Sequence, residues 1–399
     1  MPQVKPDIET FAKIKVVGVG GSGGSAINRM MASKIKGVEF IVMNTDVQAL
    51  HHNSAPQKLH IGKSVTRGLG AGMDPETGRK AAEETQNEIK EALKDADMVF
   101  VTCGLGGGTG SGASPVVASV ARELGALTVA VVTKPFAFEG PQRKNIAEKA
   151  WMELAKNVDA IITIPNERLL QMIDKKMTLL DSFKIVDDVL RQGVQGIAEL
   201  ITIPGIINVD FADVKAIMLN AGSALMGIGV GSGENRAIDA AKSAISSPLL
   251  ELSIDGASGI LFTITGGDSL TMDEVNEAAK IITSSASENA KVIFGANIDS
   301  TMGENFRISV VATGFDDRRP KVEEEENLSS QAFLNNSRYA PSNFLRRAQQ
   351  QEEEEEKKFK QIVQKASVDE IKQQSIGKAG ATDEEELEIP AFIRKKMGI

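Results

Sequence analysis

The sequence predicts an α/β protein that begins with a doubly wound parallel sheet, continues through a central helix into a smaller α+β domain, and ends in a disordered tail. Apolar runs that suit buried strands alternate with amphipathic stretches through the first half of the chain. Two of these runs lead directly into glycine-rich turns. After residue 316 the composition shifts to Glu, Gln, Lys, Ser and Asn, which is typical of a segment that cannot bury a core.

Length and composition limit the function classes. The 399 residues are enough for two domains and a tail, and the net charge of −9 argues against a nucleic-acid partner, which requires a basic face. Cys103 is the only cysteine, so an internal disulfide or a cysteine-based zinc motif is excluded. There is no signal-peptide pattern and no long apolar span. We therefore expect a cytoplasmic chain without direct membrane insertion.

The pattern divides the chain into six segments. They are a flexible arm at 1–12, a parallel-sheet domain at 13–178, a central helix at 179–203, an α+β domain at 204–316, a disordered linker at 317–382, and a partner-docking peptide at 383–399. Within the second domain we expect strands at 215–219, 222–230, 259–265, 291–295 and 307–313, with helices at 234–246 and 272–285.

The glycine-rich turn at 104–112 (GLGGGTGSG) lies between a predicted strand at 98–103 and a predicted helix at 113–122. Glycines let successive backbone N–H groups approach one point, and a helix N-terminus adds partial positive charge there. Thr109 and Ser111 add hydroxyl groups. The setting favours phosphate binding over the alternative, a merely flexible turn.

A second glycine-rich turn follows the predicted strand at 13–19 and matches the dinucleotide fingerprint G-x-G-x-x-G at Gly18, Gly20 and Gly23. A dinucleotide-dependent oxidoreductase is therefore an alternative. It is disfavoured because both turns belong to one predicted sheet and can converge on a single phosphate chain. In addition, hydride transfer often uses a His or Tyr as an acid. The only Tyr in this sequence, Tyr339, lies in the tail, and all three His fall in one polar connection at 51–60.

Polar residues follow the ends of several predicted strands, where a parallel sheet binds its ligands. Asn44, Gly104, Glu139 and Asn166 stand at such positions. Asp187 lies off the apolar stripe of the central helix, so it either faces a purine base or is a solvated carboxylate.

Asp210 and Asp213 lie just past the central helix, three residues apart. The pair suits a metal ion or a positioned water, and it equally suits helix caps and turns.

Taken together, these residues resemble one family, FtsZ, the bacterial relative of tubulin that forms the cytokinetic ring. The resemblance covers 13–316 and resumes at 387–396, and its most specific part is 106–112. Further blocks that resemble the family lie at 66–72, 191–196, 208–214 and 222–227.

The resemblance implies a tubulin-like GTPase that binds GTP or GDP with Mg²⁺. It assigns the phosphates and the neighbouring groups to Gly20, Gly21, Ser22, Gly23, Gly24, Asn44, Gly104, Gly106, Gly107, Gly108, Thr109, Gly110 and Ser111, with Ala71 and Gly72 near the γ-phosphate. Glu139 and Arg143 would contact the sugar and phosphates. Asn166 and Asp187 would hydrogen-bond guanine and Phe183 would stack on it, while Asp46 would lie near the metal ion.

The resemblance also implies that Asp210 and Asp213 enter the nucleotide site of the next subunit and position the attacking water. Hydrolysis would then require head-to-tail assembly into filaments at the division site, beneath the membrane. A scaffold that binds GTP without hydrolysing it is a further alternative. The tail residues Ile389, Pro390, Phe392, Ile393 and Arg394 would bind membrane-anchoring and regulatory division proteins.

Four positions depart from the family pattern. Ser22 replaces a usual Gly, Gly24 and Ser25 stand where Asn is frequent, and Ser111 replaces Thr. Backbone contacts should survive these changes.

Overall fold

The computed structural model describes residues 12–35, 37–170, 177–203, 205–247, 254–287 and 289–315. These ranges belong to one compact unit, Met1–Pro320. The predicted linker and docking peptide, and nearly all of the predicted arm, lie outside the described residues.

Ten strands form one sheet in the order β3-β2-β1-β4-β5-β6-β7-β10-β8-β9. They are β1 (Ile14–Val19), β2 (Val38–Asn44), β3 (Gln57–His60), β4 (Met98–Gly104), β5 (Leu127–Lys134), β6 (Ala160–Pro165), β7 (Gly222–Gly231), β8 (Gly259–Gly266), β9 (Lys291–Ile298) and β10 (Phe306–Thr313). The helices are α1 (Gly20–Ala32), α2 (Val47–His51), α3 (Lys63–Thr66), α4 (Pro75–Glu84), α5 (Gln86–Leu93), α6 (Thr109–Glu123), α7 (Pro141–Lys156), α8 (Asn166–Leu170), α9 (Leu179–Thr202), α10 (Phe211–Met218), α11 (Arg236–Ile245) and α12 (Met272–Ser284), with short 3₁₀ turns η1 (Ala137–Glu139) and η2 (Ser300–Met302).

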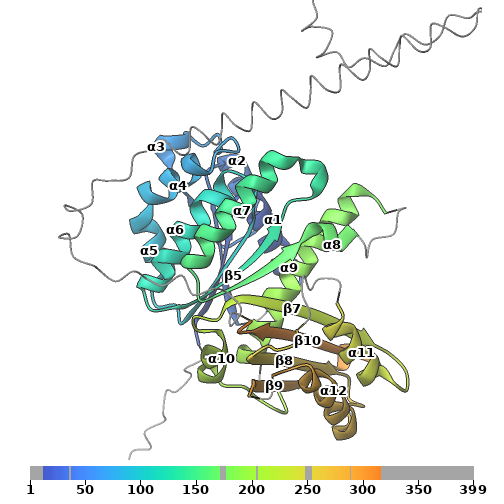
Figure 1. Ribbon diagram of the computed structural model, residues 1–399. Coiled ribbons are helices and arrows are strands. Elements are labelled where there is room, and N and C mark those ends of the chain that lie inside the picture. Colours follow the sequence, from blue (N-terminus) through green and yellow to red (C-terminus); the bar gives the residue numbers. More distant parts are fainter. Residues whose placement is uncertain are drawn as a thin grey trace, which may run out of the picture. The chain divides into compact units, whose positions relative to one another are not determined.

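The first six strands are parallel, and helices cover both faces of this part of the sheet (Figure 1). Side chains alternate along each strand, so Val16 packs with α1 and α9 whereas Val17 packs with α4, α5, α6 and α7. The predicted doubly wound sheet is confirmed. All carboxyl ends of its strands therefore meet at one edge.

The second part continues the same sheet. β7 pairs in parallel with β6 over three residue pairs, from Ala160↔Gly222 to Ile162↔Ala224. β10 then runs antiparallel to β7 and β8, and β9 runs parallel to β8. Helices α11 and α12 share an apolar cluster with this part of the sheet, while α9 packs its buried stripe on the opposite side. The predicted α+β layer is thus joined to the parallel sheet edge to edge.

The strand predicted at 215–219 is wrong, because these residues lie in and just after α10. Val214, Ile217 and Met218 are buried, which is the spacing of a helix that begins at Phe211. Between β3 and β4, α4 and α5 follow one another with a break at Thr85. No helix among the described residues is both long enough and apolar enough to cross a membrane.

Candidate functional site

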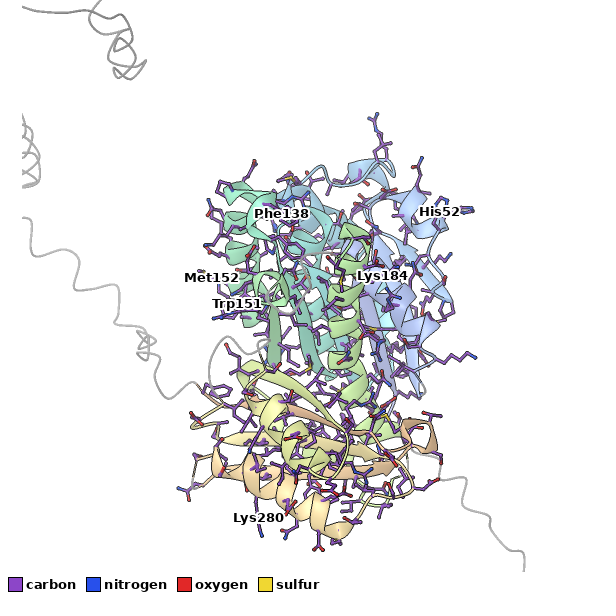
Figure 2. All side chains as sticks on the ribbon, turned by 90° about the vertical axis from the view of Figure 1, so that its right-hand side faces the viewer. His52, Phe138, Trp151, Met152, Lys184 and Lys280 are labelled. Carbon is purple, nitrogen blue, oxygen red and sulfur yellow. The ribbon has the colours of Figure 1, made fainter. Side chains whose placement is uncertain are left out.

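A cavity of about 670 Å³ opens at the carboxyl edge of the parallel strands. Its lining comes from the ends of β2, β4 and β5, from the turns at 70–73 and 104–110, and from one side of α9. Phe138, which is 64% exposed and stacks on Phe136, lies in η1, whose last residue, Glu139, lines this cavity. Figure 2 shows the side chain of Phe138 at the end of the molecule opposite Lys280 of α12.

Two helix N-termini meet at this cavity. α1 begins at Gly20 and α6 at Thr109, both within the glycine-rich turns. For α6 this is earlier than the predicted start at residue 113. Among the described residues neither helix has a side-chain cap or an acidic residue in its first turn. A Cβ atom on Gly20 would lie 2.9 Å from the Gly110 nitrogen, so the two first turns touch. Their amides and dipoles therefore favour an anion at one place.

The glycines of these turns serve two purposes. At Gly21 and Gly107 an added Cβ would meet nothing within 4 Å, and both residues line the cavity, so their backbone is open to a ligand. At Gly108 an added Cβ would lie 2.8 Å from the Ala71 Cβ, and at Gly112 it would overlap the Pro75 carbonyl. Gly108 lets the turn that precedes α4 approach closely, and Gly112 lets α4 itself pack against α6.

Side-chain hydroxyls fix the shape of the turns. Ser22 Oγ accepts a hydrogen bond from the Gly104 nitrogen at 2.8 Å, and Ser111 Oγ accepts one from the Gly106 nitrogen at 2.9 Å. Thr109 Oγ1 is 2.7 Å from Thr45 Oγ1. Ser111 is buried and does not line the cavity, so its hydroxyl shapes the turn from behind, whereas Ser22 and Thr109 face the cavity.

Two oxygen acceptors lie at the other end of the cavity. Asn166 Oδ1 is buried and has no hydrogen-bond partner within the described part of the chain. Burial raises the pKa of Asp187 to about 6 from its ordinary 3.8, and nearby Arg29 offsets part of this effect. Val186 and Leu190 supply apolar surface beside them. The arrangement suits a flat polar group that carries N–H donors.

Charged side chains also line the cavity. Arg143 Nη1 contacts Glu139 Oε2 at 3.0 Å, and both residues line the cavity. Asp46 Oδ1 caps α2 by accepting from the Gln48 and Ala49 nitrogens, and Asn44 Oδ1 accepts from the Asp46 nitrogen. In the described ranges no three His, Cys, Asp or Glu residues gather to hold a metal ion.

Most residues expected from the sequence line this cavity. They are Gly21, Ser22, Asn44, Asp46, Ala71, Gly72, Gly104, Gly107, Gly108, Thr109, Gly110, Glu139, Arg143, Asn166 and Asp187. Gly20, Gly23, Gly24, Gly106 and Ser111 lie in the same turns without lining it. Phe183 belongs to α9, but its side chain lies outside what the structure describes.

Sequence reasoning missed further lining residues. They include Ala49, Gly70, Met73, Leu105, Thr133, Pro135, Val186 and Leu190. Thr133 and Pro135 flank the end of β5, so the rule that identified Asn44 and Gly104 would also have found them.

Asp210 and Asp213 do not line the cavity of their own chain. Both are exposed at the N-terminus of α10, and Asp210 caps no amide there through its side chain. α10 leads into β7, whose first residue, Gly222, bonds to the Asp159 carbonyl at the amino end of β6. Figure 1 shows α10 at the opposite end of the parallel strands from α2 and α3. The acidic pair and the cavity thus lie at opposite edges of the sheet.

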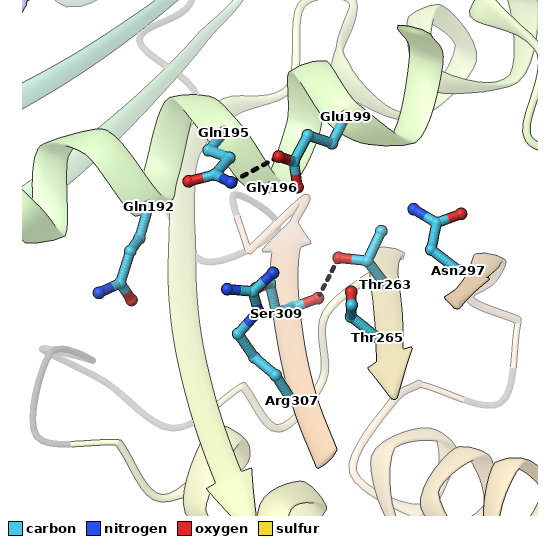
Figure 3. A pocket seen from close by; sticks show the side chains of 9 residues that line it. All are labelled: Gln192, Gln195, Gly196, Glu199, Thr263, Thr265, Asn297, Arg307 and Ser309. Carbon is cyan, nitrogen blue, oxygen red and sulfur yellow. Dashed lines mark hydrogen bonds between the residues drawn. The ribbon is translucent and has the colours of Figure 1, made fainter. Parts of the chain in front are cut away.

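A second, much smaller cavity of about 10 Å³ lies where α9 faces β8, β9 and β10 (Figure 3). Gln195 donates to Glu199 along α9, and Thr263 Oγ1 donates to the Ser309 carbonyl at 3.5 Å. The cavity holds about one water molecule. The cavity at the strand ends, at about 670 Å³, has room for a ligand of nucleotide size.

Comparisons with known proteins agree with this geometry. The family model "Tubulin/FtsZ family, GTPase domain" matches residues 13–174, and "FtsZ family, C-terminal domain" matches residues 222–316. An empty FtsZ dimer from M. jannaschii is 47% identical, with a TM-score of 0.75, over 78% of this chain and 90% of that chain. CetZ2 from Haloferax volcanii, solved as a GTPgS-bound protofilament, is 21% identical with a TM-score of 0.64, over 75% of this chain and 92% of that chain. CetZ1 from the same organism, a GDP-bound monomer, is 20% identical with a TM-score of 0.67, over 76% and 95%. The two CetZ structures share the fold.

Proposed function

The chain belongs to the tubulin/FtsZ family of GTPases, and we propose that it cuts GTP only where two copies meet head-to-tail, in filaments that form the cytokinetic ring. The main support for nucleotide binding is that the uncapped N-termini of α1 and α6 meet at one cavity. The phosphates would take the place of the missing caps of α1 and α6. The contacts proposed for individual residues are those that the family resemblance implies, and most of these residues line that cavity.

Guanine fits the far end of the cavity better than adenine does. Guanine presents adjacent N–H donors on its pairing edge, and the Asp187 carboxylate is an acceptor only. The unpartnered Oδ1 of Asn166 adds a second acceptor. Phe183, four residues before Asp187 on the same helix, is proposed to stack on the base.

Mg²⁺ fits this site as an ion held mainly by the nucleotide. Such ions keep several waters and bind through one or two carboxylates together with phosphate oxygens. Asp46 is the carboxylate proposed for this role, because only its Oδ1 atom is used as a helix cap within the described residues. When bound, the ion neutralises charge on the phosphates.

The shared active site is supported by the separation of its two halves. A parallel strand of six residues spans about 20 Å, so Asp210 and Asp213 at one edge of the sheet do not reach the cavity at the other. A second copy stacked in the same orientation would bring its acidic pair to the cavity of the first. In that arrangement the carboxylates orient a water, whose oxygen attacks the γ-phosphorus while the bond to the leaving GDP oxygen breaks.

Contacts of this kind are head-to-tail and propagate as open filaments. The FtsZ dimer and the CetZ2 protofilament among the similar structures support self-association. A role at the division site beneath the membrane, in the cytoplasm, belongs to the same proposal. So does the binding of anchoring and regulatory division proteins by residues 389–394, which lie outside the described residues. The domain division at 13–178, 179–203 and 204–316 also remains a proposal.

The test uses two variants of the full chain that complement each other. Asp213→Asn should bind GTP and lose about 100-fold or more in turnover. Gly107→Asp should fold, because an added Cβ meets nothing within 4 Å there, but its carboxylate should repel the phosphates. A mixture of the two should recover turnover, because one copy supplies the cradle and the other the intact acidic pair.

Asp273→Asn is the matched control, since Asp273 is an exposed acid in the first turn of α12 as Asp213 is in α10. It should leave turnover unchanged. Normal turnover by the Asp213→Asn variant alone would exclude the shared site. Binding of GTP by the wild-type chain without any turnover would favour the non-hydrolysing scaffold.

A further inference from the structure

We propose that the Ser22 hydroxyl is a side-chain phosphate donor that this chain adds to the backbone amides of its nucleotide site. The inference rests on the proposed function, because it concerns the same cavity. The resemblance to FtsZ does not supply this role, because Ser22 is one of the positions at which this chain departs from the family pattern.

Ser22 connects the two glycine-rich turns. It stands in the first turn of α1, and its Oγ accepts a hydrogen bond of 2.8 Å from the nitrogen of Gly104, where β4 ends and the second turn begins. A Cβ on Gly104 would lie 2.5 Å from this Oγ, so the contact requires glycine at 104. The hydroxyl is thus held at a fixed place between the turns.

The hydrogen of this hydroxyl is available to a ligand. A serine hydroxyl has one hydrogen to donate and two lone pairs, and the Gly104 N–H uses one lone pair. Among the described residues no acceptor is recorded for the Ser22 hydrogen. Ser22 is exposed and lines the cavity beside Gly21, Thr109 and Gly110, whose first-turn amides are themselves donors. The missing acceptor at this end of the cavity would be a phosphate oxygen.

Ser111 provides an internal comparison. Its Oγ accepts from the Gly106 nitrogen at 2.9 Å, so two serines hold the second turn in the same way. Ser111 is buried and lines the groove between α4, α6 and α7, on the other side of the turn. Of these two serines, Ser22 alone combines the turn contact with access to the cavity.

The experiment measures the affinity of the full chain for guanosine, GMP, GDP and GTP by displacement of a fluorescent GDP analogue. The variants are Ser22→Ala and Ser22→Gly, and the control is Ser119→Ala, which removes an exposed α6 hydroxyl whose partner is Glu123. A lost hydrogen bond to an ionised group should weaken binding about tenfold to hundredfold. The ratio of variant to wild-type Kd should be near one for guanosine. Along the series GMP, GDP and GTP, it should rise at the first ligand that carries the phosphate contacted by Ser22. It should then stay constant for ligands with further phosphates.

The melting temperature of each nucleotide-free variant shows whether it folds. If the variant and wild-type Kd values agree within twofold for all four ligands, the inference is overturned. Binding of GDP by the wild-type chain in the same experiment would still support the proposed function. A ratio that starts at guanosine, or grows with every added phosphate, would also overturn it, because a distorted turn weakens every contact. A wild-type chain that binds no GDP would overturn the proposed function and this inference together.

Discussion

Replacement of Asp187 by Asn should make the nucleotide-free chain more stable and the nucleotide complex weaker. Burial raises the pKa of Asp187 to about 6, with Arg29 offsetting part of the effect, so its charge is unfavourable in the folded chain at neutral pH. Because the folded pKa lies above the ordinary value of 3.8, stability is greatest below 3.8 and is lost as pH rises through about 6. Removal of the charge should therefore restore about 1 kcal/mol, after allowance for partial exposure to solvent.

A gain of about 1 kcal/mol corresponds to a rise of roughly 2 °C in Tm for a folded unit of this size. The rise should be seen at pH 7.5 and disappear near pH 5, where Asp187 is already protonated. GDP affinity should fall about tenfold to hundredfold in the variant, since guanine loses a charged acceptor. In the wild-type chain it should weaken as pH falls below about 6.

Asp188, the next residue in α9, is a matched control for which the opposite change in Tm is expected. Burial acts to raise the pKa of Asp188, but hydrogen bonds from Arg191 and Gln192 outweigh it and hold that pKa below its usual value. Asp188→Asn should therefore lower Tm at pH 7.5. Differential scanning fluorimetry of the nucleotide-free chains gives both results. A lower Tm for Asp187→Asn at pH 7.5, or an unchanged GDP affinity, would refute the assignment.

Three further changes have outcomes that the structure sets. Gly112→Ala should cost about 2 kcal/mol of stability, because its Cβ would overlap the Pro75 carbonyl. Gly107→Ala should keep its Tm and bind GDP more weakly, because its Cβ points into open space. Equal melting temperatures for the two variants would contradict the packing described for Gly112. Arg236→Met should lower stability by about 3 kcal/mol in urea titration, because it removes the charged partner of Glu274. The Arg236 side chain is 8% exposed, and its Nε lies 2.6 Å from Glu274 Oε1. Hydrogen bonding from Arg236 lowers the pKa of Glu274, so this contribution should be present above about pH 4.5 and be lost as pH falls further; a flat profile would show the pair to be unimportant.

Sequence periodicity was sufficient for the parallel sheet because its buried strands are continuous apolar runs bounded by turns. It failed at 215–219, where Ile217 and Met218 look like strand residues when considered alone. The helical spacing becomes visible only when Phe211 and Val214 are included, and tertiary burial of that stripe then decides the outcome. The edge pairing of β6 with β7 joins residues far apart in sequence, and no local pattern encodes it.

The candidate site was predictable where strand ends carry polar residues, as at Asn44 and Asn166. The orientation of a side chain within a turn was not. Ser111 and Ser22 have the same hydroxyl and similar glycine-rich neighbours, yet one is buried behind the turn and the other faces the cavity. That difference arises from the packing of α4 against α6, which depends on distant residues.

The bare first turns of α1 and α6 make the ligand a part of the folded structure. Without it, two sets of backbone donors and two positive dipole ends lie close together, and among the described residues no side-chain cap satisfies either set. A nucleotide at about 100 times its Kd would add about 2.7 kcal/mol to the stability of the chain. The resistance of this protein to heat and to proteolysis would therefore follow the concentration of guanine nucleotides in the cell. In a cell depleted of guanine nucleotides, the same chain would be less stable and more easily cleaved.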